Sequence, residues 1–116
     1  MSRFAKEKSI GAATFAAIGA LKSARLGFYD QGNHKYSEII LSEPQEIASC
    51  TGNISTKEDK IFVHAHSTLA NRNGKTTGGH LLEGKVFAGE IHLLELLGKN
   101  VVRKYDNVTG LYLWDF

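Results

Sequence analysis

IFVHAHSTLANRNGKTTGGHLLEGKVFAGEIHLLEL, residues Ile61 to Leu96, is the segment around which the rest of this chain is arranged. Its first ten residues alternate with a period of two, which is typical of a strand with one face toward the core. Because every second side chain shares a face, His64 and His66 are predicted to point the same way. One face carries Ile61, Val63, Ala65 and Leu69, and the other carries Phe62, His64, His66 and Thr68.

A third histidine follows in the same stretch. Asn71-Arg72-Asn73-Gly74 predicts a hairpin turn, since Asn-Gly pairs tolerate the positive φ angles of tight turns. The returning strand is predicted at Thr76–Leu82, and His80 follows Gly78-Gly79, a pair that lets two backbones approach closely. The sequence therefore predicts that three imidazoles converge, on two neighbouring strands.

The segments outside this stretch predict a mostly β domain with one short helix. Ser2–Ser9 is charged and lacks strand formers, which predicts a helix with Phe4 and Ala5 facing inward. Ile10–Leu21 is ambiguous, because its alanines favour a helix and its two interior glycines disfavour one. Further strands are predicted at Ser23–Asp30, Lys35–Ser42, Gln45–Ser55, Val86–Leu96, Val101–Tyr105 and Leu111–Phe116.

Two residues predict irregularities in these strands. Pro44 indicates a bend or an edge position after Lys35–Ser42, because proline cannot donate to a strand ladder. Gly52 indicates a bulge or bend within Gln45–Ser55.

Composition predicts one ordinary folded domain covering residues 1–116. The net charge is only +2, and the 14 basic residues are scattered, with Arg103 and Lys104 the only adjacent pair. No run supplies the basic patch that binding to nucleic acid phosphates requires. Cys50 is the single cysteine, so no intrachain disulfide forms, and we interpret it as a small buried apolar residue. With no secretory signal and no membrane-spanning run, we expect a cytoplasmic protein.

Several motifs resemble the plant-and-prokaryote-conserved domain, a family found alone in bacteria and archaea and behind AT-hooks in plant nuclear proteins. The resemblance runs through nearly the whole chain, and the combination of HxH with GGHLLEG is fairly specific. It is carried by IGALKSARLGFYD at Ile18–Asp30, LSEPQEIASCTGNIS at Leu41–Ser55, FVHAHSTLANRNG at Phe62–Gly74 and GGHLLEGKVFAGEIHLLEL at Gly78–Leu96.

The resemblance implies an α/β (α+β) fold, with a mostly antiparallel sheet packed on one short helix, assembled as a homotrimer. It also implies that Ile10–Leu21 is a strand. This chain departs from the family at its start, since family members usually begin with a strand before the first helix. It also lacks the Arg-Gly-Arg-Pro hook with which plant members enter the minor groove, because its sole proline, Pro44, follows Glu43.

The three histidines are the candidate functional residues. Neutral imidazoles are zinc ligands, and three of them leave a fourth position open for water or a ligand. The spacing and the resemblance together indicate a site for zinc or another divalent transition metal at His64, His66 and His80. The alternative is a polar pocket or subunit contact built from the same side chains. Glu83, Glu90 and His92 are candidates for a supporting or pocket role.

These observations lead to one hypothesis and two alternatives. The hypothesis is a non-enzymatic, homotrimeric binding or regulatory domain with a three-histidine metal or small-ligand site. A metal-dependent enzyme of unknown substrate that uses the same site is the first alternative, with Glu83 or Glu90 as base. A DNA-associated protein, indicated by the family label alone, is the second.

Overall fold

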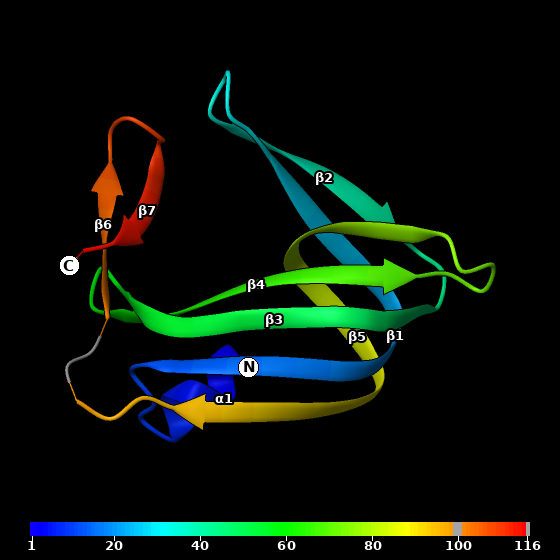
Figure 1. Cartoon of the computed structure of the whole chain (residues 1–116), viewed down its shortest axis with the longest axis horizontal. Helices are drawn as coiled ribbons and strands as arrows, with labels where there is room; N and C mark the ends of the chain where they lie inside the picture. The colour runs from blue at the N-terminus through cyan, green and yellow to red at the C-terminus, as the bar shows by residue number, and fades with distance from the viewer. Residues whose placement is uncertain (99–100, 116) are drawn as a thin grey trace.

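The computed structural model describes residues 1–98 and 101–115. Within these residues, one short helix precedes seven strands, which form one sheet in the order β2-β1-β5-β4-β3-β6-β7 (Figure 1). The elements are α1 Ser2–Glu7, β1 Ala13–Asp30, β2 Lys35–Leu41, β3 Gln45–Lys57, β4 Lys60–Ala70, β5 Thr76–Glu95, β6 Val102–Asp106 and β7 Leu111–Trp114. The predicted mostly β fold with one short helix is confirmed.

The two longest strands close the sheet on itself. β1 pairs with β5 along most of its length and also with β3, while β4 joins β3 to β5. Both β1 and β5 bend sharply and run behind the front strands (Figure 1). Register shifts between β1 and β5 mark the bend, and Gly19 adopts a φ of 129° beside it. A Cβ at Gly19 would lie 2.3 Å from the Ala88 carbonyl oxygen, so this close approach requires glycine.

Two groups of buried side chains fill the fold. Leu21, Ala24, Leu26 and Leu69 form one group inside the bent strands. The other lies between α1 and the sheet and consists of Ala5, Ile10, Ala13, Phe15, Cys50, Ile54 and Ala65. Cys50 is a free, buried thiol as predicted. Within the described residues, no helix is both long and apolar enough to cross a membrane.

Several predicted elements were located correctly. Ile10–Leu21 contributes to β1, as the resemblance implied, and β2 is an edge strand that ends before Pro44. The Asn71–Gly74 turn is confirmed, since Gly74 N donates to Asn71 O at 2.8 Å and Gly74 has a φ of 75°. The C-terminal hairpin is confirmed at β6 and β7, although Phe116, at the end of the predicted strand, lies outside the described residues.

Other predictions were wrong in detail. Phe4 does not face inward: it is 46% exposed, because the six-residue α1 turns only Ala5 fully into the core. Gly52 is not a bulge, since the pairing of β3 with β4 runs through it without a shift, and the irregularity lies between Ile47 and Ser49. The separate strands predicted at Thr76–Leu82 and Val86–Leu96 form one continuous strand, β5.

Candidate metal centre

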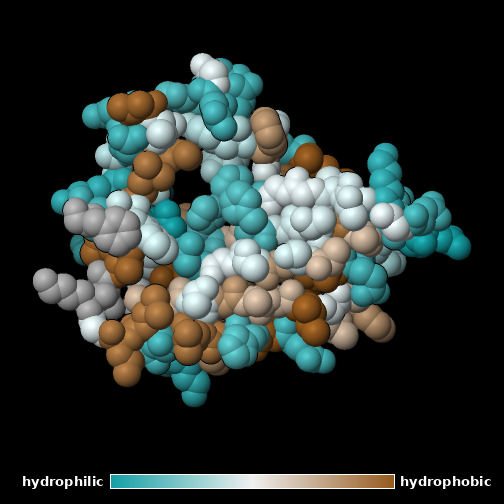
Figure 2. All heavy atoms as spheres, viewed as in Figure 1, coloured by the Kyte–Doolittle hydropathy of each residue, from teal (hydrophilic) through white to brown (hydrophobic). Residues whose placement is uncertain are grey.

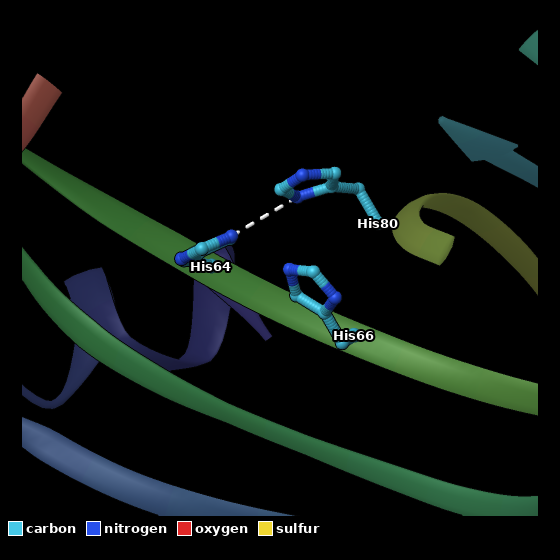
Figure 3. Close-up of side chains that lie close together, drawn as sticks. All are labelled: His64, His66 and His80. Carbon is cyan, nitrogen blue, oxygen red and sulfur yellow. Dashed lines mark hydrogen bonds between the residues drawn. The ribbon is translucent and has the colours of Figure 1, made fainter. Parts of the chain in front are cut away.

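The backbone pairing of β4 with β5 brings the three predicted histidines together. His66 and His80 are direct cross-strand partners, and His64 lies two residues before His66 on the same face of β4. Ring centroids are 4.1 Å apart for His66 and His80, 5.0 Å for His64 and His80, and 5.1 Å for His64 and His66. Figure 3 shows the three rings facing a common space. The predicted convergence is confirmed.

The ring nitrogens lie near metal-binding distances from one another. One nitrogen of each ring falls within a group whose members are all within 4.8 Å of one another. His64 Nε2 and His80 Nδ1 are 3.0 Å apart, which is hydrogen-bonding distance (Figure 3). Ligands about 2.0–2.1 Å from a tetrahedral zinc ion lie about 3.3 Å from each other. Small rotations of the side chains would therefore place all three nitrogens around one ion.

A close backbone approach holds His80 in place. A Cβ at Gly79 would lie 2.7 Å from the carbonyl oxygen of Gly27, so only glycine lets β1 run this close beside His80. His80 is also the direct partner of Gly27 in the ladder between β5 and β1. The Gly78-Gly79 pair in the sequence thus marked a real contact between two backbones.

The surroundings of the cluster favour neutral imidazoles. Burial, together with the smaller effects of the charges of His80, Arg103 and His66, lowers the pKa of His64 from 6.5 to about 4. The pKa of His80 is also lowered, first by burial and then by His66. Neutral imidazole is the form that binds a metal ion, so the site is prepared for a cation at neutral pH.

Three other predicted site residues lie elsewhere on β5. Glu83 pairs with Arg25, whose Nη2 is 3.4 Å from its carboxylate, and Glu90 is the cross-strand partner of Ile18. His92 pairs with Ala16, and two further ladder steps, through Thr51, separate Ala16 from His66. Among the described residues, none of the three forms a hydrogen bond or ion pair with the cluster. A supporting role for them stays a prediction.

Sequence reasoning missed Arg103, which lies beside the cluster. Its side chain is 8% exposed, whereas scattered basic residues usually form a solvated surface. The guanidinium donates to Ser55 Oγ, to Asn53 Oδ1 and to the Tyr112 carbonyl oxygen at 2.8–2.9 Å. The only available signal was the basic pair Arg103-Lys104 within Val101–Tyr105, which does not identify the partners of either side chain.

Three hollows meet at the histidines. One of about 530 Å³ is lined by His64 and His80, one of about 330 Å³ by His64 and His66, and one of about 720 Å³ by His66 and His80. Figure 2 shows an opening between the β6–β7 hairpin and the β1–β2 ribbon. An ion held by the three rings would therefore be reachable from solvent and by a small ligand.

Comparison with known proteins gives a family and close structural relatives. A model of the Plants and Prokaryotes Conserved (PCC) domain family matches residues 1–97. A metal-containing protein from Archaeoglobus fulgidus is 44% identical, with a TM-score of 0.94 over 99% of this chain and 81% of that one. A plant- and prokaryote-conserved protein from Pyrococcus horikoshii is 40% identical, with a TM-score of 0.93 over 99% and 80% of the chains.

Two further relatives carry different names. A Bacteroides thetaiotaomicron protein, called a "putative dna binding protein", is 30% identical, with a TM-score of 0.92 over 99% of this chain and 80% of that one. The bifunctional protein GlmU of Synechococcus sp. (strain JA-3-3Ab) is 32% identical over 113 residues. This chain spans only 17% of the length of that protein, so the name of the longer protein assigns no activity to this chain.

The lowered pKa of His64 predicts acid sensitivity in the metal-free protein. Between pH 6.5 and about 4 the unfolded chain binds more protons at this residue than the folded chain, so stability falls as the pH falls through that window. Thermal melting of chelator-treated protein across this range should show the loss, and His64→Gln should reduce it. His34→Gln, at an exposed histidine outside the cluster, should keep the full loss. An unchanged pH profile in His64→Gln would contradict this account.

Proposed function

Because the chain belongs to the Plants and Prokaryotes Conserved domain family, we propose that it is a binding domain whose His64, His66 and His80 hold one divalent transition metal ion. The observation that carries this proposal is the convergence of the three ring nitrogens within 4.8 Å. The metal-containing relative from Archaeoglobus fulgidus supports it. The role as a binding or regulatory domain, rather than an enzyme, is part of the same proposal.

The donor set fits zinc and related ions. Imidazole nitrogen suits zinc, copper, iron and nickel, whereas magnesium and calcium prefer oxygen ligands. Three histidines leave a fourth position on zinc open, and a bound zinc ion would supply a Lewis acid that takes water or an anionic ligand there. Zinc is our first choice.

The surroundings favour binding over catalysis. Metal-assisted hydrolysis needs a base within hydrogen-bond reach of the bound water. Glu83 pairs with Arg25, and Glu90 lies in the second half of β5 beside Ile18. A metal-dependent enzyme with this site would need a base from elsewhere, such as a second subunit.

DNA binding is the weaker alternative. The name of the Bacteroides thetaiotaomicron relative supports it. The chain has a net charge of only +2, whereas binding to the phosphates of DNA depends on a concentrated basic surface.

Removal of the histidines tests the metal centre. Protein purified without a histidine tag should contain about one metal ion per chain by mass spectrometry, since three imidazoles bind one ion. The His64→Ala/His66→Ala variant should lose it. His34→Ala, which removes an exposed histidine outside the cluster, is the matched control and should retain it. Equal metal content in the double variant and in wild type would refute the site.

Self-association as a homotrimer is the second part of the proposal. The second half of β5 is rich in apolar residues, yet most of its large side chains face solvent, with Phe87 73% exposed. Figure 2 shows apolar residues along the lower edge of the molecule, where β5 ends. A concentration of exposed apolar side chains on one segment is typical of an interaction surface. The exposed set comprises Ile18, Val86, Phe87, Ile91, Leu94, Leu96 and Leu97. The expectation of three chains in the assembly comes from the family resemblance.

Charge introduced into this patch should break the assembly. Wild-type protein should sediment at about three times the chain mass of 12.7 kDa. Phe87→Glu should shift the protein toward the mass of one chain, because a buried unpaired carboxylate disfavours the interface. Val108→Glu makes the same change at another exposed site, on the C-terminal hairpin, and should leave the assembly intact. Wild-type sedimentation at 12.7 kDa would contradict the proposal.

A further inference from the structure

The hollow beside His64 and His80 contains charged and aromatic side chains to which the proposed metal centre gives no role. This pocket of about 530 Å³ lies between β4 and the β6–β7 hairpin, and its volume is typical of sites for small molecules. The hairpin lies beyond the residues matched by the family model, which end at residue 97. This wall of the pocket is therefore supplied by a segment outside the family match.

Two cations face the same pocket from neighbouring strands. Lys57 and Arg103 both line it, and they are direct partners in the parallel pairing of β3 with β6. Like charges at partner positions repel each other. The repulsion between Lys57 and Arg103 is unfavourable, and an anion bound between the two groups would offset it.

No carboxylate neutralises this pair among the described residues. The ion pairs formed by the described residues have Arg3, Arg25 and Lys104 as their cations, and none includes Lys57 or Arg103. Arg103 uses three of its five N–H groups on neutral oxygens, which leaves its charge uncompensated. Lys57 Nζ stands 3.7 Å above the centre of the Tyr112 ring, a contact that also leaves its charge in place.

One acidic side chain, that of Glu58, contacts a residue that lines the pocket. Glu58 is exposed and accepts a hydrogen bond from Tyr112 Oη at 2.5 Å. It is not a lining residue of the pocket, which contains no aspartate or glutamate among the described residues. Glu58 therefore holds the Tyr112 ring, and it forms no ion pair with Lys57 or Arg103 among the described residues.

The remaining walls are apolar and aromatic. Arg103 lies 5.2 Å from the centre of the Phe62 ring, and Tyr36 meets His80 edge to face at 5.2 Å. These rings offer flat surfaces for an unsaturated ligand. The apolar lining is completed by Val63, Ala65, Leu81, Leu82, Leu111 and Leu113.

We propose that this pocket binds a small carboxylic acid with an aromatic or aliphatic body, with its carboxylate at Lys57 and Arg103 and its body against Phe62 and the leucines. The inference deepens the proposed function and rests on it, because His64 and His80 form one wall. It gives the metal centre a ligand class: an organic anion bound beside the ion.

Benzoate is a direct probe of this pocket. Titration of the tag-free, zinc-loaded protein, followed by calorimetry and by amide NMR shifts, should show binding of benzoate in the range of about 1 mM or tighter. Benzamide has the same shape without the charge and should bind at least about tenfold more weakly. Inorganic phosphate should also bind more weakly, because it has no apolar body to bury.

Variants at Lys57 distinguish benzoate binding in the pocket from a general effect of the protein's positive charge. Lys57→Gln should weaken benzoate binding about tenfold, and Lys57→Arg should restore most of it. Lys60→Gln is the matched control, because it removes the same charge from an exposed position on the same hairpin and should leave binding unchanged. Equal binding of benzoate and benzamide, or equal losses in the two glutamine variants, would overturn the proposal.

The same samples distinguish this inference from the metal centre. Protein that contains zinc by mass spectrometry and does not bind benzoate would overturn the anion pocket alone. Protein that contains no metal and still discriminates benzoate from benzamide through Lys57 would overturn the metal centre and support the pocket.

Discussion

The backbone pairing of β4 with β5 sets the distances between the three histidine rings, because His66 and His80 are direct partners in that ladder. A shift of one residue in this register would move His80 to the opposite face of the strand. The Asn71–Gly74 turn fixes the register at one end of the pairing, and the contact of Gly79 with Gly27 fixes the position of β5 against β1. The site therefore depends on backbone geometry rather than on contacts among its side chains.

The C-terminal hairpin adds a charge to this backbone framework. Arg103 links β6 to Asn53 and Ser55 of β3, whose neighbours across the ladder are His64 and Phe62. The buried guanidinium lowers the pKa of His64 and lines the pocket beside it. A cationic wall next to a metal centre selects for anions at the position that three histidines leave open. Metal and anion sites would thus share one electrostatic environment.

Local sequence patterns predicted the parts of the site that depend on local geometry. The period of two placed His64 and His66 on one face, and Asn73-Gly74 predicted the hairpin that returns to His80. Contacts between distant segments have no such signal: nothing in Val101–Tyr105 indicates that β6 pairs in parallel with Thr56 and Lys57. Arg103 and the cationic pocket that it lines with Lys57 were missed for that reason. Glu83, Glu90 and His92 share β5 with His80, but the length and bend of that strand separate the last two from the cluster.

X-ray absorption at the zinc edge tests the central claim most directly, since it reports the atoms bound to the ion. We expect three imidazole nitrogens at about 2.0–2.1 Å, with an oxygen as the fourth ligand. A spectrum that shows sulfur at about 2.3 Å, or only one imidazole, would contradict it.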